Sequence, residues 1–178
     1  MSARRYFKAS FAAAAGYLVV AAISVVKPQP DNHWNAAGRA LEAAFIVGLV
    51  GSAVAIAGVT AMLSRRPLGT RAGRLAQIGF VGLTVASVAS LIEGGNTLGP
   101  VFVLSLLATL VGLLLLGIAG LREGLVARWL PVLPFATMLI GIALAEHGGC
   151  AVIAAGWIAM ALGLFSTTTS LQRAAAPA

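Results

Sequence analysis

Apolar residues run along this chain in long blocks that short polar connections separate. A membrane-spanning helix needs about 20 mostly apolar residues, and six blocks reach or nearly reach that length. The pattern predicts spans at residues 9–26, 41–63, 75–92, 100–121, 129–145 and 150–166. The last two blocks lie at the lower edge of the spanning range, so a re-entrant hairpin is an alternative for that pair.

The composition supports a membrane class. Of 178 residues, 60% are hydrophobic and 10% are charged, whereas a soluble domain carries about 25% charged residues. We therefore expect an all-α integral membrane helical bundle, with six transmembrane helices arranged as three hairpins in a single domain over residues 1–178. The net charge of +7 does not indicate nucleic-acid binding, because the basic residues form no patch with interleaved aromatic side chains.

The positions of the basic residues predict the orientation of the spans. If the N-terminus is cytoplasmic, ten of the twelve Lys and Arg residues fall on the cytoplasmic side, and only Lys27 and Arg39 fall outside. Positive charge in short connections favours the cytoplasmic side. The sequence therefore predicts six spans with both termini cytoplasmic. Its heavy use of Ala, Gly, Arg and Leu suits a GC-rich bacterial genome, so we expect a protein of the bacterial plasma membrane.

The outer connections fit a repeated hairpin. The third and fifth blocks each end in an acid and then two glycines, which permit the positive φ of a tight reversal. The first outer connection is instead the polar stretch KPQPDNHWN at 27–35. Its two prolines make it stiff and extended. We expect this segment to cover the outer mouth of the bundle, and an interfacial loop anchored by Trp34 is the alternative.

Four of the five acids fall at the outer level of the predicted spans: Asp31, Glu42, Glu93 and Glu146. Helix ends near water are the cheapest place for polar residues, so the clustering alone does not indicate chemistry. A carboxyl group at the rim of an apolar cavity is nevertheless suited to general acid catalysis, because desolvation raises its pKa toward neutrality. We predict Glu93 as the first proton donor and Glu42 as its partner. Glu146 and Asp31 are the next candidates.

Glu93 is expected to point into the bundle. It closes a helix face that carries Gly82, Ala86 and Ser90, and small residues at this spacing let helices approach closely. The hydroxyl groups of Thr84 and Ser87, on a neighbouring stripe, are expected to bond back to their own helix. The side chains expected to contact a ligand near the acids are His33, Trp34, His147, Asn96 and Ser90.

No cofactor or metal is predicted. The two histidines, His33 and His147, lack the HxxH spacing of a ligand pair, and the chain has one cysteine. The single cysteine, Cys150, is expected to pack as a small apolar residue. The sequence also lacks a P-loop, a dinucleotide fingerprint, HExxH and GxSxG.

The stretch LLGIAGLREGLVARWLPVLP, residues 115–134, resembles segments of small polytopic bacterial membrane proteins of unassigned function, and the resemblance implies no activity. Three functions remain open. The first is a multi-pass protein that holds an apolar small molecule in an outer-leaflet cavity rimmed by carboxylates, as an acid–base cyclase or isomerase of a prenyl, terpenoid or polyketide-like substrate. The second is a small oligomeric transporter or channel. The third is a non-catalytic membrane subunit or binder, surrounded by membrane lipids, that forms oligomers through small-residue faces such as Gly156, Ala159 and Gly163.

Overall fold

The computed structural model describes residues 3–26, 36–63, 67–93, 98–123 and 129–174, and it describes residues 3, 4, 62, 123, 146 and 164–174 by their backbone alone. Every regular element in these ranges is a helix, so the all-α prediction is confirmed. The elements are α1 (Ala3–Val26), α2 (Ala36–Met62), α3 (Pro67–Glu93), α4 (Gly99–Glu123), α5 (Leu133–Ala143), the short 3₁₀ helix η1 (Ala145–His147) and α6 (Cys150–Ala174).

Four of these helices, α1 to α4, are long and apolar enough to cross a membrane. Helix α5 is shorter, and the part of α6 whose side chains are described, Cys150–Gly163, is apolar. At about 1.5 Å per residue, the 11 residues of α5 cover about 16 Å, roughly half of a hydrocarbon core of about 30 Å. The bundle therefore has four apolar helices of full spanning length, the short α5, and α6, which has 25 residues.

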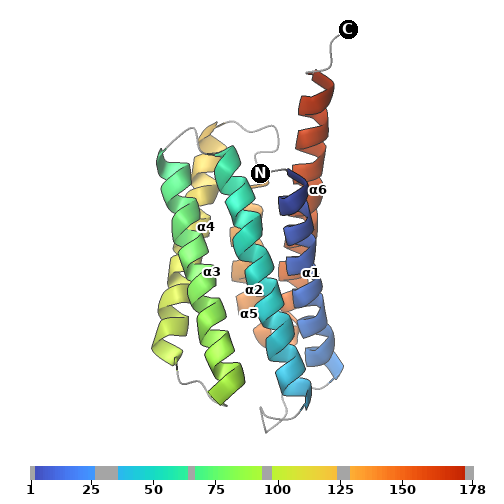
Figure 1. The fold of residues 1–178 in the computed structure, drawn as a ribbon, viewed down its shortest axis with the longest axis vertical. Helices are drawn as coiled ribbons and strands as arrows, with labels where there is room; N and C mark the ends of the chain where they lie inside the picture. Colours follow the sequence, from blue (N-terminus) through green and yellow to red (C-terminus); the bar gives the residue numbers. More distant parts are fainter. Residues whose placement is uncertain (1–2, 27–35, 64–66, 94–97, 124–128, 175–178) are drawn as a thin grey trace.

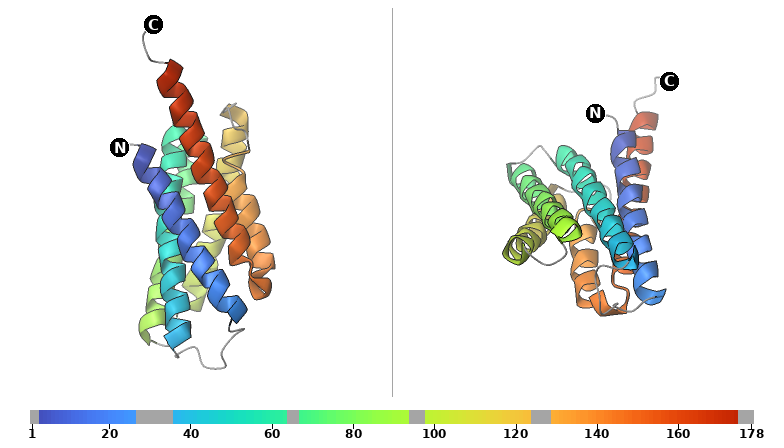
Figure 2. Two further views of the ribbon diagram at one scale, coloured as in Figure 1. Left: turned by 90° about the vertical axis from the view of Figure 1, so that its right-hand side faces the viewer. Right: turned by 60° about the horizontal axis from the view of Figure 1, so that its bottom comes forward.

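The helices stand side by side and the chain reverses direction at each connection, so that both termini lie at the same end of the bundle (Figure 1). We call this the termini end and the other the opposite end. Helix α1 packs extensively on α2 and α6, α2 on α3, and α3 on α4. Helix α5 packs on α6 and has fewer contacts with α4. At the termini end, α6 runs beyond its neighbours (Figure 2).

Glycines bring the helices of each hairpin into backbone contact. A Cβ atom added to Gly16 of α1 would lie 2.5 Å from the backbone nitrogen of Gly48 of α2. One added to Gly79 of α3 would lie 2.5 Å from the backbone nitrogen of Thr109 of α4. Real Cβ contacts are essentially never shorter than 3.0 Å, so these interfaces require glycine. Small residues at helical spacing have the packing role expected from the sequence.

Prolines and glycines explain why α5 is shorter than the predicted span at 129–145. Pro134 lies in the first turn of α5, where its missing N–H and fixed φ are tolerated. The residues before it form a turn, in which the backbone nitrogens of Val132 and Leu133 donate to the carbonyl oxygen of Trp129. After Ala143 the chain tightens into η1 and reverses at Gly148, whose φ of 80° suits glycine.

Large side chains fill the centre of the bundle. Tyr17, Phe80, Leu113 and Met160 are fully buried. The rings of Phe80 on α3 and Trp157 on α6 meet edge-on, with centroids 6.4 Å apart, and so connect two helices that are not neighbours in the chain. Trp157 is 3% exposed, so it packs inside the bundle.

One predicted assembly face is used within the chain instead. A Cβ atom at Gly156 would meet the side chain of Thr137 on α5, and one at Gly163 would meet Leu130. The prediction that these two glycines contact other subunits is therefore wrong. Thr137 of α5 and Leu130 in the turn before α5 cover these glycines, because this segment packs closely on α6.

Candidate functional site

The predicted carboxylate site lies at the opposite end of the bundle, where α1 and α3 end, α2 and α4 begin, and η1 leads into α6 (Figure 1). Glu42, in the second turn of α2, is half-buried. Glu93 is the last residue of α3 and is exposed. Helices α2 and α3 pack on each other, so the structure brings these two acids to one end on neighbouring helices.

The expected inward orientation of Glu93 is not observed. The last buried residue of α3 is Ser87, and Ser90, three residues before Glu93, is only half-buried. Burial on α3 stops before its last turn, so the face that carries Gly82 and Ala86 is no longer buried at Ser90 and Glu93. Sequence periodicity identified this face correctly but contained no information on where its packing ends.

The turn between α5 and α6 also lies at the opposite end. It contains His147, which is exposed, and Glu146, whose backbone belongs to η1 and whose side chain is not among those described. The backbone nitrogens of His147 and Gly149 both donate to the carbonyl oxygen of Leu144, each at 2.8 Å. Together with the positive φ of Gly148, these bonds make the tight diglycine reversal that the sequence predicts.

The remaining predicted site residues are Asp31, His33, Trp34 and Asn96, and they lie outside the described residues, as does the whole segment 27–35 proposed to cover the site. Within the described part of the chain, no three His, Cys, Asp or Glu side chains are grouped so that they could hold a metal ion.

Comparison of the chain with family models, curated proteins and solved structures gave no match. Its function is therefore argued from its own residues.

A buried polar contact between α1 and α2 was missed by the sequence analysis. The hydroxyl oxygens of Tyr17 and Ser52 are 3.3 Å apart, and both residues are fully buried. The Ser52 hydroxyl donates to the carbonyl oxygen of Gly48 at 2.7 Å, which leaves the Tyr17 hydroxyl as the donor to Ser52. Tyr17 also meets Phe45 edge-on, at 6.0 Å between ring centroids. A tyrosine in the middle of an apolar block was the available signal, because a buried tyrosine hydroxyl usually finds a partner.

The other hydroxyl groups mostly follow the expected local pattern. Thr84 donates to the carbonyl oxygen of Phe80 at 2.8 Å, and Thr109 donates to that of Ser105 at the same distance. The back-bonding predicted for Thr84 is thus confirmed. These two hydroxyl groups donate to carbonyl oxygens of their own helices. They therefore do not contribute to a polar path through the described part of the bundle.

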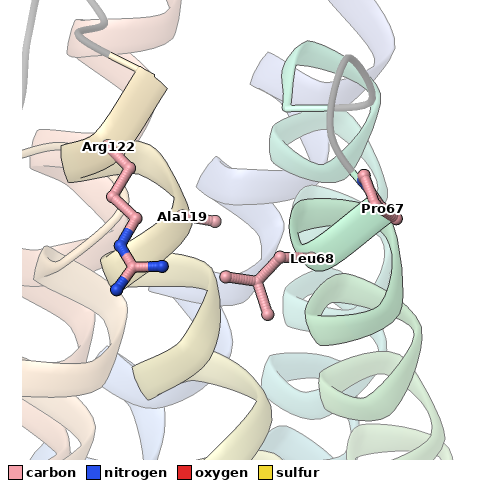
Figure 3. A pocket seen from close by; sticks show the side chains of 4 residues that line it. All are labelled: Pro67, Leu68, Ala119 and Arg122. Atoms are coloured by element: carbon pink, nitrogen blue, oxygen red, sulfur yellow. The ribbon is translucent and has the colours of Figure 1, made fainter.

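A cavity of about 180 Å³ lies at the termini end, away from Glu42 and Glu93 (Figure 3). Pro67 and Leu68 from the first turn of α3 line one side, and Ala119 and Arg122 from the last turns of α4 line the other. Among these described lining residues, the charged one is the cation Arg122. The chemistry of this cavity therefore differs from the carboxylate chemistry predicted from the sequence.

Proposed function

We propose that the chain crosses a bacterial plasma membrane six times, with both termini in the cytoplasm. The charge distribution supports this proposal, because Arg39 lies at the opposite end whereas the other exposed cations of the described part gather at the termini end. These cations are Arg5, Lys8, Arg71, Arg74 and Arg122. The segments on both sides of α5 support a fifth span, because the turn at 129–132 and the residues of η1 lengthen this segment beyond the about 16 Å of α5 itself.

We further propose that the protein acts as a non-catalytic membrane subunit. The filled interior carries this proposal. Backbone contacts at Gly16 and Gly79 close two hairpins, and the buried rings of Tyr17, Phe80 and Trp157 occupy the centre. Pockets for small-molecule ligands measure about 300–1,000 Å³, and the cavity at the termini end is smaller, at about 180 Å³.

A non-catalytic subunit acts through its outer surface. Close helix association in a membrane relies on small side chains, because lipid offers no hydrophobic driving force between helices. Gly156 and Gly163 are already covered within the chain. The exposed small side chains that remain for contact with another copy or another subunit include Ala12 and Ala15 on α1 and Ala151 and Ala155 on α6.

The second candidate is the acid–base enzyme for an apolar substrate. Glu42 favours it, because this carboxyl is half-buried at the end where Glu93 also lies. A partly desolvated carboxyl is the group that general acid catalysis requires.

Comparison of membrane extracts separates the two candidates. Cells that express the wild type, the Glu42→Gln/Glu93→Gln double variant or no protein are compared for apolar metabolites by mass spectrometry. We expect no compound to depend on the two carboxyl groups. A compound that accumulates with the wild type and disappears in the double variant would support the enzyme instead.

The mass of the detergent-solubilised particle tests the subunit proposal separately. We expect a particle that holds more than one protein chain. A particle with a single chain under mild extraction would contradict the subunit proposal.

A further inference from the structure

The described lining of the cavity at the termini end consists of three apolar residues, Pro67, Leu68 and Ala119, and one cation, Arg122. Leu68 points from α3 across toward α4, and the Arg122 guanidinium lies on the facing side (Figure 3). Leu68 is half-buried and Ala119 is 2% exposed. Arg122 itself is exposed, so its guanidinium group is accessible from outside the bundle.

The space exists because the tight part of the α3–α4 hairpin lies further from the termini end. Added Cβ atoms at Gly79, Gly82 and Gly112 would all collide with atoms of the partner helix. These contacts fix the two helices at short distance in the middle of the bundle. Beyond them, Pro67 and Leu68 face Ala119 and Arg122 across the cavity.

The surroundings of the cavity are positively charged. Arg71 and Arg74 follow Pro67 by four and seven residues, so they lie on the same side of α3, and both are exposed. Among the described side chains, the two acids, Glu42 and Glu93, lie at the opposite end. Glu123 ends α4 directly after Arg122, but the exposed cations of the described part outnumber it at this end, so a negatively charged ligand is attracted there.

We propose that the cavity binds an anionic phospholipid, with the Arg122 guanidinium on the phosphate and the apolar walls on the adjoining glycerol and acyl carbons. A guanidinium group offers paired donors that match phosphate oxygens. The chemistry of the walls identifies a lipid rather than a free anion, because Pro67, Leu68 and Ala119 offer no side-chain donors to replace the hydration of a soluble phosphate. Past Arg71 and Arg74, the exposed side chains along the membrane-facing part of α3 are apolar, beginning with Ile78, and Leu114 on α4 is exposed and apolar as well.

The inference rests on the membrane placement proposed above, and the test examines insertion first. The protein is reconstituted into nanodiscs of phosphatidylcholine and phosphatidylglycerol with identical acyl chains. Failure to enter the nanodiscs would contradict the membrane placement and the lipid site together. Insertion without any preference between the two lipids would contradict the lipid site alone.

Affinity is then measured by native mass spectrometry, as delipidated protein in detergent is titrated with each lipid. A basic residue near the membrane surface contributes about a five-fold preference for anionic lipid. We expect Arg122→Gln to weaken phosphatidylglycerol binding by about five-fold or more and to leave phosphatidylcholine binding unchanged. Arg122→Lys should bind phosphatidylglycerol with an affinity between those of the wild type and Arg122→Gln, because lysine keeps the charge and loses the paired donors.

Arg5→Gln is the matched control. Arg5 is an exposed arginine at the same end, on α1, which packs on α2 and α6 rather than lining the cavity. It should change phosphatidylglycerol binding by less than about two-fold. Equal losses in Arg5→Gln and Arg122→Gln would show a general surface charge and overturn the site, and so would displacement of the lipid by millimolar inorganic phosphate.

Discussion

The close contact between α1 and α2 allows a quantitative test with two identical substitutions. In Gly16→Ala, the new methyl group would lie 2.5 Å from the nitrogen of Gly48, 2.6 Å from the oxygen of Ala44 and 2.9 Å from the Cα atom of Gly48. All three are backbone atoms, so no side chain can rotate away and the helices must separate. Overpacking of this kind costs about 1–3 kcal/mol.

Gly117→Ala in α4 is the matched control. Its methyl group would lie 3.3 Å from the Cα atom and 3.4 Å from the Cγ2 atom of Val132, which a few tenths of an ångström of movement would relieve. Both substitutions gain the same helix propensity, about 1 kcal/mol for alanine over glycine. This gain cancels in the comparison, so the difference between the two variants measures the overpacking alone.

The free energy of unfolding of both variants is measured in mixed micelles, as the denaturing detergent SDS is increased. We expect Gly16→Ala to be less stable than Gly117→Ala by about 1–3 kcal/mol. For a chain of this length, each kcal/mol of lost stability lowers Tm by about 2–4 °C. Equal stability of the two variants would show that α1 and α2 are not in backbone contact at Gly16, and it would refute the glycine-based account of the hairpin.

Three further experiments test other contacts. Ala86→Leu places a larger side chain at a position that is 5% exposed and should cost about 1–3 kcal/mol; unchanged thermostability in detergent would mean that this face of α3 is open to lipid. Tyr17→Phe and Ser52→Ala should show a coupling of about 0.6 kcal/mol in a double-mutant cycle, the average for hydrogen bonds between membrane helices, and zero coupling would exclude the bond. Gly148→Ala should cost about 1–2 kcal/mol, because φ is 80° there, while Gly148→Asn should cost less.

The length of the apolar blocks predicted the helical parts of this fold well, because a run of about 20 apolar residues is a local feature of the sequence. The predicted blocks at 41–63 and 100–121 coincide closely with α2 and α4. The start of α3 was placed at residue 75, whereas the helix begins at Pro67. Hydropathy marks where a helix becomes apolar, and Arg71 and Arg74 continue the helix outside that block because arginine is a good helix former.

Contacts between helices were beyond the reach of the sequence. Gly156 and Gly163 have the spacing of an assembly face, yet they face Thr137 and Leu130 in the same chain. A stripe of small residues predicts close approach without identifying the partner. The same limit applies to the candidate site, because an acid predicted to face the bundle can be exposed, like Glu93, where burial stops before the end of its helix.

The six-span topology is tested most directly at the turn between α5 and α6. Cys150 is first replaced by alanine, and single cysteines are then placed at His147, which is exposed in η1, and at Thr70, near the start of α3. A membrane-impermeant maleimide is added to intact cells. Six spans predict labelling at position 147 from outside and at position 70 only after the membrane is permeabilised. If only the four long helices cross the membrane, both positions lie on the cytoplasmic side, and protection of position 147 in intact cells would contradict the account.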